Sequence, residues 1–387
     1  MRSVIILGAT GSIGRQTQEV LRAFPSEFVV EGLSAHSRMD ELVVAARALG
    51  VKHVVVQTRE QASDVQAALP HVTVRYGVES LVEMCSLFPG ALVVNALLGA
   101  AGVRPTLTAL QSGCDVALAN KETLVAAGEI VMKTARLAGQ SIIPIDSEHS
   151  AIWQCLRGSS PDEVERLVLT ASGGPFRDTP VEQLARVTVA EALRHPTWQM
   201  GAKISIDSAT LMNKGFEVIE AHHLYQMSYD KIDVIVHPQS VIHSLVEFVD
   251  GALLAQLGTP DMRTPITYAL FAGGQRRDHA FARLRLSDLS ALTFVAPDTI
   301  KFPALALAYT CGRQGGTAPA VMNAANEVAV DAFLHGRMAF TQIYEVVERV
   351  VQQAPFVTDP QLDDVLVADR EARAAAERAI EQSVKHV

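Results

Sequence analysis

The sequence predicts an α/β fold in three parts: an N-terminal Rossmann-type doubly wound sheet, a central α+β domain with a mixed sheet, and a C-terminal helical bundle. Two observations predict this order. Apolar runs alternate with helical patterns up to residue 146, which is typical of buried parallel strands joined by crossover helices. From residue 298 onwards, apolar residues recur at helical spacing, which predicts packed helices.

Composition limits the class of protein. The 387 residues are 49% hydrophobic and 19% charged, so the chain can bury a large core in two or three domains. The net charge of −9 comes without a basic stripe, which argues against a nucleic-acid partner. Four widely spaced cysteines without a CxxC pair, and an apolar strand beginning at residue 4, predict a cytoplasmic protein without a leader peptide.

One uncharged segment, Met84 to Val103, is long enough to cross a membrane. It contains Pro89, Asn95 and three glycines, and its apolar core is short. We therefore interpret it as a buried parallel strand that ends in a glycine turn, and we expect no membrane partner.

The first predicted strand, residues 4–7, continues into a glycine-rich loop, GATGSIG at 8–14, and then into a helical pattern. This is the order that a dinucleotide site needs, because glycine lets the pyrophosphate approach the backbone at the helix N-terminus. The spacing is GxxGxxG instead of GxGxxG, so a glycine turn that only packs remains the alternative.

The second predicted strand, residues 29–33, is followed by His36, Ser37 and Arg38. An NAD site usually has an acidic residue there for the ribose 2′-hydroxyl, and Glu31 lies too early, inside the strand. Imidazole, hydroxyl and guanidinium groups instead suit a 2′-phosphate, so the sequence predicts NADPH. An exposed polar loop is the alternative.

Polar clusters follow the last two predicted strands of this sheet, where ligands of doubly wound sheets bind. They are Asn120-Lys121-Glu122, after strand 115–119, and Asp146-Ser147-Glu148-His149, after strand 141–145. An extended backbone would point Asp146 and Glu148 to one side, and paired carboxylates favour a hard cation, Mg²⁺ or Mn²⁺. The alternative is that Asp146 or Ser147 caps a helix.

From residue 162 the pattern changes to a mixed sheet, with strands predicted at 167–170, 233–236, 244–248 and 253–257. The segment 172–202 has little regular pattern but contains adjacent glycines and the large side chains of His195, Trp198 and Met200, as a lid would. We interpret His237 and His243 as structural.

The stretch 195–221 concentrates polar side chains. Asn213, Lys214 and Gly215 interrupt an apolar run before a helical pattern that contains Glu217. A loop with lysine, asparagine and serine before a helix can bind a phosphate, and Glu217 could serve a metal beside it. The alternative is an ordinary strand, turn and capped helix with a solvated charged face.

These patterns divide the chain into four predicted parts. They are an NADPH-binding Rossmann domain at 1–146, a catalytic domain at 147–271 with its lid at about 172–202, a linker at 272–297 and a helical domain at 298–387.

The motifs together resemble the 1-deoxy-D-xylulose 5-phosphate reductoisomerase family. The matching segments are GATGSIG (8–14), LANKE (118–122), DSEH (146–149), SGGPF (172–176), HPTWQMG (195–201), IDSATLMNKGFEVIEA (206–221), HPQSVIH (237–243) and GTPDMRTP (258–265). They occur in the family's order and cover both larger domains. The segment His36-Ser37-Arg38 is one that the family varies.

The resemblance implies roles for the matched positions. These roles are additional to the 2′-phosphate contacts His36, Ser37 and Arg38, which are predicted from their place after the second strand. The resemblance implies metal ligands at Asp146, Glu148 and Glu217, catalytic roles for Lys121 and Glu148, substrate contacts from Ser147, Ser172, His195, Trp198, Ser208, Asn213 and Lys214, and NADPH contacts from Thr10, Gly11, Ser12, Ile13, Asn120, Glu122 and Gly201.

The implied reaction joins an isomerisation to a reduction. The substrate 1-deoxy-D-xylulose 5-phosphate is rearranged by retro-aldol cleavage and aldol addition, and hydride from NADPH then gives 2-C-methyl-D-erythritol 4-phosphate. This is the first committed step of the non-mevalonate (MEP) route to isoprenoid precursors. The family is usually homodimeric, so a second copy is the expected macromolecular partner. A metal-free nicotinamide dehydrogenase and a nucleotide-sensing protein are the competing functions, and neither explains three carboxylates around one cation.

Overall fold

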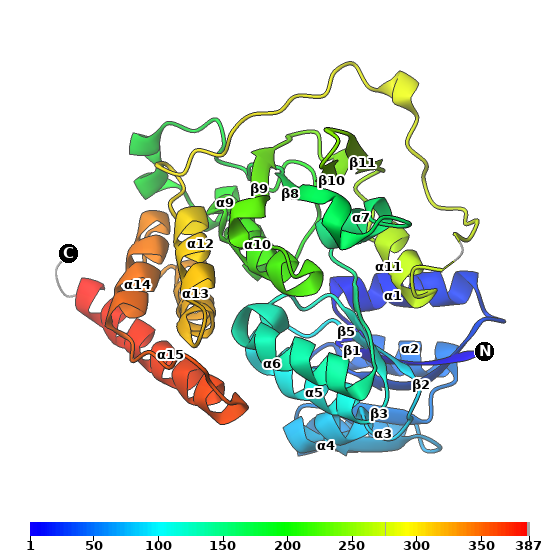
Figure 1. Cartoon of the computed structure of the whole chain (residues 1–387). Coiled ribbons are helices and arrows are strands. Elements are labelled where there is room, and N and C mark those ends of the chain that lie inside the picture. The colour runs from blue at the N-terminus through cyan, green and yellow to red at the C-terminus, as the bar shows by residue number, and fades with distance from the viewer. Residues whose placement is uncertain (275, 385–387) are drawn as a thin grey trace. The chain divides into compact units, whose positions relative to one another are not determined.

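The structure is a computed structural model that describes residues 1–274 and 276–384 (Figure 1). Its contacts divide the chain into two compact units. The first unit comprises Met1–Thr123, Val131–Ser150 and Asp261–Ala282, and the second comprises Leu124–Ile130, Ala151–Pro260 and the chain from Arg283 onwards. Each unit has a sheet of its own.

The first unit is built on a seven-stranded parallel sheet with the strand order β4-β3-β2-β1-β5-β6-β7. The central strands are buried apolar runs, as the doubly wound prediction requires. Strand order reverses between β1 and β5, the position at which such sheets bind ligands. The strands are β1 (Arg2–Leu7), β2 (Phe28–Ser34), β3 (His53–Val56), β4 (Thr73–Tyr76), β5 (Leu92–Asn95), β6 (Asp115–Leu118) and β7 (Ile142–Pro144).

Helices connect these strands. Those wholly in the first unit are α1 (Ser12–Ala23), α2 (Met39–Leu49), α3 (Arg59–Ala68), α4 (Gly77–Met84), α5 (Val103–Gln111), the 3-10 turn η1 (Gly99–Gly102) and α11 (Arg263–Leu270). Two helices, α6 (Glu122–Ala138) and α7 (Ser147–Cys155), contribute residues to both units. The uncharged segment 84–103 contains β5 and η1, as predicted. Among the described residues, no helix is both long and apolar enough to span a bilayer.

β4 and α4 were not predicted from the sequence. β4 is the edge strand of its sheet and its four residues are exposed or half-buried. An edge strand needs no continuous apolar run, so the pattern used to find the other strands is missing from it.

The predicted boundaries differ from the two units. Residues 261–282 return to the first unit, although we placed them in the catalytic domain and the linker. The reason is that α11 packs against α1, where the Arg263 guanidinium lies 3.2 Å from the Glu19 carboxylate. The Phe271 ring also stands edge-on to Phe24 and Phe28.

The second unit contains the predicted mixed sheet. Its strand order is β11-β10-β8-β9, in which β8 and β9 are parallel and β10 is antiparallel to β8 and β11. The strands are β8 (Val164–Ala171), β9 (Ile232–Val236), β10 (Ile242–Phe248) and β11 (Leu253–Leu257). This unit also contains short helical turns, of which the first precedes β8 and the last follows β11: η2 (Pro161–Glu163), η3 (Val181–Arg186), α8 (Val189–Ala192), η4 (Tyr229–Lys231) and η5 (Leu286–Asp288).

The C-terminal helices form the predicted bundle. α13 contacts α12, α14 and α15, and the four helices lie side by side in Figure 1. They are α12 (Ala304–Gln314), α13 (Ala318–Leu334), α14 (Phe340–Gln353) and α15 (Leu362–Val384). One continuous apolar core includes α13 and the fully buried Phe216 of the central region.

The segment after Gly201 forms two helices, α9 (Ala202–Ala209) and α10 (Met212–Tyr225). The alternative of a strand over the first part is wrong, and so is the loop that we predicted around Asn213 and Lys214, because both lie in the first turn of α10. α9 is buried from Ser205 to Ala209, so its polar residues point inward too and no helical period is visible in the sequence.

Candidate active site

In the glycine loop after β1, Gly8 and Gly14 have no room for a side chain. A Cβ on Gly8, whose φ is +83°, would lie 2.5 Å from the Ala96 carbonyl oxygen, and a Cβ on Gly14 would overlap the Gly8 carbonyl. α1 starts at Ser12 after Gly11, which has extended backbone and, as a glycine, no side chain to cap the first N–H groups of the helix. The first N–H groups of α1 can therefore bind an anion.

The segment His36-Ser37-Arg38 lies beside this loop. The Thr10 hydroxyl donates to the Ser37 carbonyl at 3.0 Å, and the Gln61 side-chain amide donates to the His36 carbonyl at 3.1 Å. All three side chains of the segment are exposed. They stand at the carboxyl end of β2, where the predicted 2′-phosphate contacts should be.

Asn120 organises the loop between β5 and α5. Its side chain is 1% exposed, and its amide nitrogen donates to the Leu97 and Gly99 carbonyls at 3.0 and 2.9 Å. Its amide oxygen accepts from the Thr123 N–H at 3.1 Å. The side chain is therefore used inside the protein, and a contact with a cofactor would have to come from the Asn120 backbone.

Acidic residues stand at the end of β7, in the first unit. The Lys121 Nζ lies 2.6 Å from the Asp146 Oδ2, and the Ser147 hydroxyl donates to the Glu148 Oε2 at 2.6 Å. The extended backbone predicted over 146–148 is wrong, because α7 begins at Ser147 and Glu148 lies in its first turn. α7 does begin directly after Asp146, where the capping alternative expected a helix, and the Ser147 N–H donates to the Asp146 Oδ1 at 3.1 Å.

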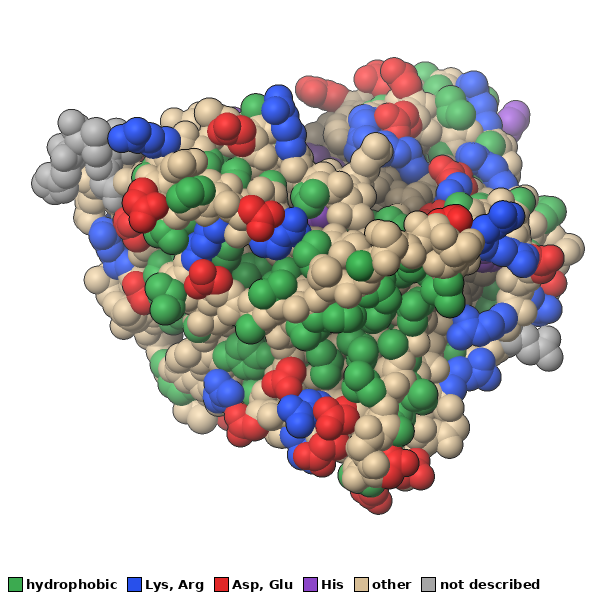
Figure 2. Space-filling view, turned by 90° about the horizontal axis from the view of Figure 1, so that it is seen from above, with side chains coloured by type: hydrophobic (Ala, Val, Ile, Leu, Met, Phe, Trp, Pro, Cys, Tyr) green, Lys and Arg blue, Asp and Glu red, His purple; other side chains and the backbone are tan. Residues whose placement is uncertain are grey.

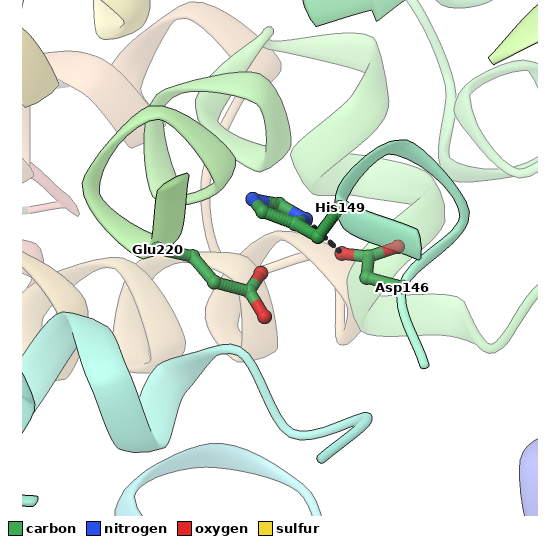
Figure 3. A group of neighbouring side chains, drawn as sticks. All are labelled: Asp146, His149 and Glu220. Carbon is green, nitrogen blue, oxygen red and sulfur yellow. Dashed lines mark ion pairs between the residues drawn. The ribbon is translucent and has the colours of Figure 1, made fainter. Parts of the chain in front are cut away.

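His149 is a neighbour that the sequence analysis left without a role. Its ring is fully buried, and its Nδ1 lies 3.9 Å from the Asp146 Oδ2, as Figure 3 shows. The only signal in the sequence was the spacing of three residues, which places two side chains on one face of a helix. Figure 3 also labels Glu220, a fully buried residue of α10 in the second unit.

In the second unit, the structure brings Ser172 and His195 together. The Ser172 hydroxyl lies 2.8 Å from the His195 Nε2. The Nδ1 of the same ring accepts from the backbone N–H groups of Thr197 and Trp198, at 3.2 and 2.9 Å. Nδ1 must therefore carry the lone pair and Nε2 the proton, which it donates to Ser172. Burial lowers the pKa of His195 to about 4, so the ring is neutral at pH 7.

Ser208 joins this group through the backbone. A Cβ on Gly174, whose φ is +69°, would lie 2.6 Å from the Ser208 carbonyl oxygen, so the turn after Ser172 packs directly on the end of α9. The Gly174 N–H also donates to the Ser172 hydroxyl at 3.2 Å. Ser172 and Ser208, both predicted to contact substrate, are therefore held on two segments in direct contact.

Asn213, Lys214 and Glu217 form one group on α10. The Asn213 amide and the Lys214 ammonium each donate to the Glu217 carboxylate. Lys214 and Glu217 are 3% and 1% exposed. Burial strengthens the attraction between these two opposite charges.

The predicted lid contains few regular elements, as expected. Trp198 lies over His243 of β10, with their ring centroids 6.0 Å apart, and Gly201 is exposed directly before α9. His237 is structural: its ring nitrogens bond to the backbone of Thr293 and Val241, at 2.9 and 3.3 Å. The interpretation of His237 is thus confirmed.

The parallel sheet with its glycine loop, and the polar groups around Lys121 and His195, define the class of protein: a dinucleotide-dependent oxidoreductase. The family model described as 1-deoxy-D-xylulose 5-phosphate reductoisomerase matches residues 4–128, and its two C-terminal domain models match 142–225 and 257–375. The chain belongs to the 1-deoxy-D-xylulose 5-phosphate reductoisomerase family.

Relatives bearing this name match almost the whole chain. That of Pelotomaculum thermopropionicum is 49% identical over 96% of this chain and 97% of its own. The structure of the Zymomonas mobilis protein in complex with NADPH is 43% identical with a TM-score of 0.91, covering 98% of this chain and 99% of the other. A complex with NADPH, fosmidomycin and magnesium is 40% identical with a TM-score of 0.94, covering 98% of both chains. The resemblance predicted from the motifs is confirmed.

Proposed function

We propose that this protein converts 1-deoxy-D-xylulose 5-phosphate into 2-C-methyl-D-erythritol 4-phosphate, using NADPH and a divalent cation. The observation that carries the proposal is the match of almost the whole chain to reductoisomerases, among them one whose complex contains NADPH and magnesium. The reaction is the first committed step of the MEP route to isoprenoid precursors.

The substrate phosphate is assigned to Ser172, His195, Ser208, Asn213 and Lys214. Lys214 brings the positive charge, because His195 is neutral at pH 7. The hydroxyl and amide groups of the others offer neutral donors to phosphate oxygens. Holding this remote end supplies binding energy that orients the reacting carbons.

We assign the divalent cation to the carboxylates of Asp146, Glu148 and Glu217. Carboxylate oxygens alone make a hard donor set, which fits Mg²⁺ or Mn²⁺. Asp146 and Glu217 each pair with a lysine ammonium, that of Lys121 and that of Lys214. When bound, the cation supplies Lewis-acid stabilisation of negative charge on substrate oxygens.

Lys121, Ser147 and Glu148 are assigned to the reacting carbons. The Ser147 hydroxyl donates a hydrogen bond to the Glu148 Oε2 at 2.6 Å. The two side chains can therefore exchange a proton with a substrate hydroxyl beside them. The Lys121 ammonium, 6% exposed and 2.6 Å from Asp146, can donate to a substrate oxygen that gains charge. Trp198, on the lid, would cover the substrate and exclude water.

NADPH is assigned to the first unit. Its pyrophosphate would bind the N–H groups of Ser12 and Ile13 beside Thr10 and Gly11, and its 2′-phosphate would bind the exposed side chains of residues 36–38. The bound cofactor supplies the hydride. Glu122 and Gly201 remain assigned as further contacts, and Asn120 holds the loop at this edge of the sheet.

We also propose a homodimer formed through β11. This edge strand carries no charged residue, and its Leu253, Leu254 and Leu257 are 54%, 49% and 36% exposed. Figure 2, seen from the side on which β11 lies in Figure 1, shows hydrophobic side chains gathered on this face. Leu254→Lys should reduce the mass measured by light scattering to that of one 41.6 kDa chain. An unchanged mass would contradict this interface.

A reducing, cytoplasmic location is proposed as well. None of the four cysteines forms a disulfide in the part of the chain that the structure describes, and all four are buried, where they act as small apolar side chains. Alkylation of the denatured protein from cells should label all four thiols.

The proposed activity is tested by following NADPH consumption with 1-deoxy-D-xylulose 5-phosphate. Consumption should require substrate, stop after chelation and return with Mg²⁺ or Mn²⁺, and mass spectrometry should identify the product as 2-C-methyl-D-erythritol 4-phosphate. A protein that binds NADPH but consumes none under these conditions would overturn the proposal.

A further inference from the structure

A buried negative charge in the second unit remains without a role. Asp207, on α9, is 1% exposed and directly precedes Ser208. A buried carboxylate is costly unless ionic or hydrogen-bonding partners surround it. The partners of Asp207 therefore indicate which parts of the structure it connects.

Each oxygen of the Asp207 carboxylate has a different partner. The Lys203 ammonium, one turn earlier on α9, lies 2.8 Å from Oδ2. The Asn326 side-chain amide donates to Oδ1 at 2.7 Å, from a position 119 residues further along the chain. Asn326 is fully buried on α13, the central helix of the C-terminal bundle.

The same group extends to α10. The Lys203 ammonium lies 4.8 Å from the centre of the Phe216 ring, which is fully buried and precedes Glu217. The helix that carries Ser208 is thus joined to the helix that carries Lys214, and both are joined to the bundle.

The end of α9 is held from two sides. On one side Gly174 packs on the Ser208 backbone, and on the other the Asp207 side chain is bonded to α13. A shift of α9 would move Ser208 relative to Ser172, which lies on the segment that packs against α9. It would also move Ser208 relative to His195, which contacts Ser172.

We propose that Asp207, through its hydrogen bond with Asn326, is a positioning residue for the phosphate pocket. It fixes the end of α9 to α13, and so sets where the Ser208 hydroxyl stands. This inference rests on the proposed function, in which Ser208 binds the substrate phosphate. The C-terminal bundle, which contributes no residue to the assigned site, thereby controls the affinity for the phosphate end.

Asn326→Leu tests the proposal, and Asn323→Leu is its matched control. Asn323 lies one turn earlier on α13 and is equally buried, but its amide donates to Glu327 of the same helix, at 2.9 Å. Both variants weaken the bundle by removing a buried hydrogen bond. Only Asn326→Leu removes the bond to α9.

Two quantities are measured on the full-length protein: the dissociation constant for inorganic phosphate, by calorimetry, and kcat/KM for the sugar phosphate. We expect Asn326→Leu to weaken phosphate binding and lower kcat/KM, each by about 10- to 100-fold, because a misplacement of about 1 Å has effects of this size. Asn323→Leu should change both by less than about twofold at a similar loss of thermal stability, and the dissociation constant for NADPH should stay the same in both variants.

A rescue variant separates positioning from general destabilisation. Asn326→Asp places two carboxylates together and should weaken phosphate binding. Adding Asp207→Asn restores an amide facing a carboxylate and should recover most of the lost affinity.

Equal phosphate affinities in Asn326→Leu and Asn323→Leu, or a double variant no better than Asn326→Asp, would overturn the inference. A wild-type protein that binds no phosphate would overturn it too. Failure of the proposed function is read separately, as a wild-type protein that binds phosphate and NADPH but does not turn over.

Discussion

Gly174→Ala should damage the phosphate pocket more than it damages the fold. Gly174 has a φ of +69°, and an alanine there is disfavoured by roughly 1–2 kcal/mol. The new Cβ would also lie 2.6 Å from the Ser208 oxygen and 3.1 Å from the Ala209 Cα. Both atoms are backbone, so they cannot rotate away, and crowding of this kind costs about 1–3 kcal/mol. The total loss of stability should be about 2–5 kcal/mol.

Gly158→Ala is the matched control. Gly158 has a φ of +89° in the same unit, but a Cβ there would meet nothing within 4 Å. Gly158→Ala should therefore lose only the stability that the unfavourable φ costs an alanine, about 1–2 kcal/mol. The difference between the two variants therefore isolates the contact between the turn and α9.

Urea unfolding measures the loss of stability, and steady-state kinetics measures the damage to the phosphate pocket. We expect kcat/KM for the sugar phosphate to fall about 10- to 100-fold in Gly174→Ala, because the two segments must move apart, and to be unchanged in Gly158→Ala. If Gly174→Ala were no less stable than Gly158→Ala and had normal kcat/KM, the packing of this turn on Ser208 would not position the site.

Four residues give further predictions. Lys214→Met should raise KM for the substrate by about 10- to 150-fold, because a hydrogen bond to a charged group contributes about 1.5–3 kcal/mol to binding. An unchanged KM in steady-state kinetics would exclude the phosphate contact. Asp146→Asn should lower kcat at least about 100-fold at saturating Mg²⁺ while NADPH fluorescence titration stays normal; near-normal turnover would remove it from the metal ligands. His195, whose pKa burial lowers from 6.5 to about 4, should make the protein lose stability as pH falls from 6.5 towards 4, since the unfolded state binds a proton there and the folded state does not. Urea unfolding at pH 7 and 5 should show a weaker pH dependence in His195→Gln, and an equal one would contradict the buried neutral ring. Arg38→Ala should raise KM for NADPH and leave that for NADH unchanged, and a wild-type preference for NADH would contradict the assignment of residues 36–38.

Much of the first unit could be predicted from local patterns. Buried parallel strands are apolar along their whole length, and the glycine loop at 8–14 is a short motif whose residues all lie together. The edge strand β4 was missed because partial exposure removes that pattern. Lys121 and Asp146 could be selected because they stand in short motifs at strand ends, whereas the roles of Ser208 and Lys214, which lie on helices, came from the family resemblance.

Contacts between distant residues could not be predicted. Asp207 and Asn326 are 119 residues apart, and neither residue differs locally from an ordinary polar side chain. α9 and the first turn of α10 were misread because their residues are mostly buried, which removes the amphipathic period, whereas the rest of α10 was predicted as a helix. Asn120 shows the same limit, because its buried amide serves carbonyls of a loop more than twenty residues earlier.

The return of residues 261–282 to the first unit affects how the chain is made on the ribosome. The Phe24 and Phe28 rings pack against Phe271, which is translated more than two hundred residues later. At roughly 5–20 residues per second, this delay lasts about ten to fifty seconds, during which the nascent sheet lacks its last helix and exposes an apolar surface. Newly made chains should therefore be chaperone substrates until α11 emerges.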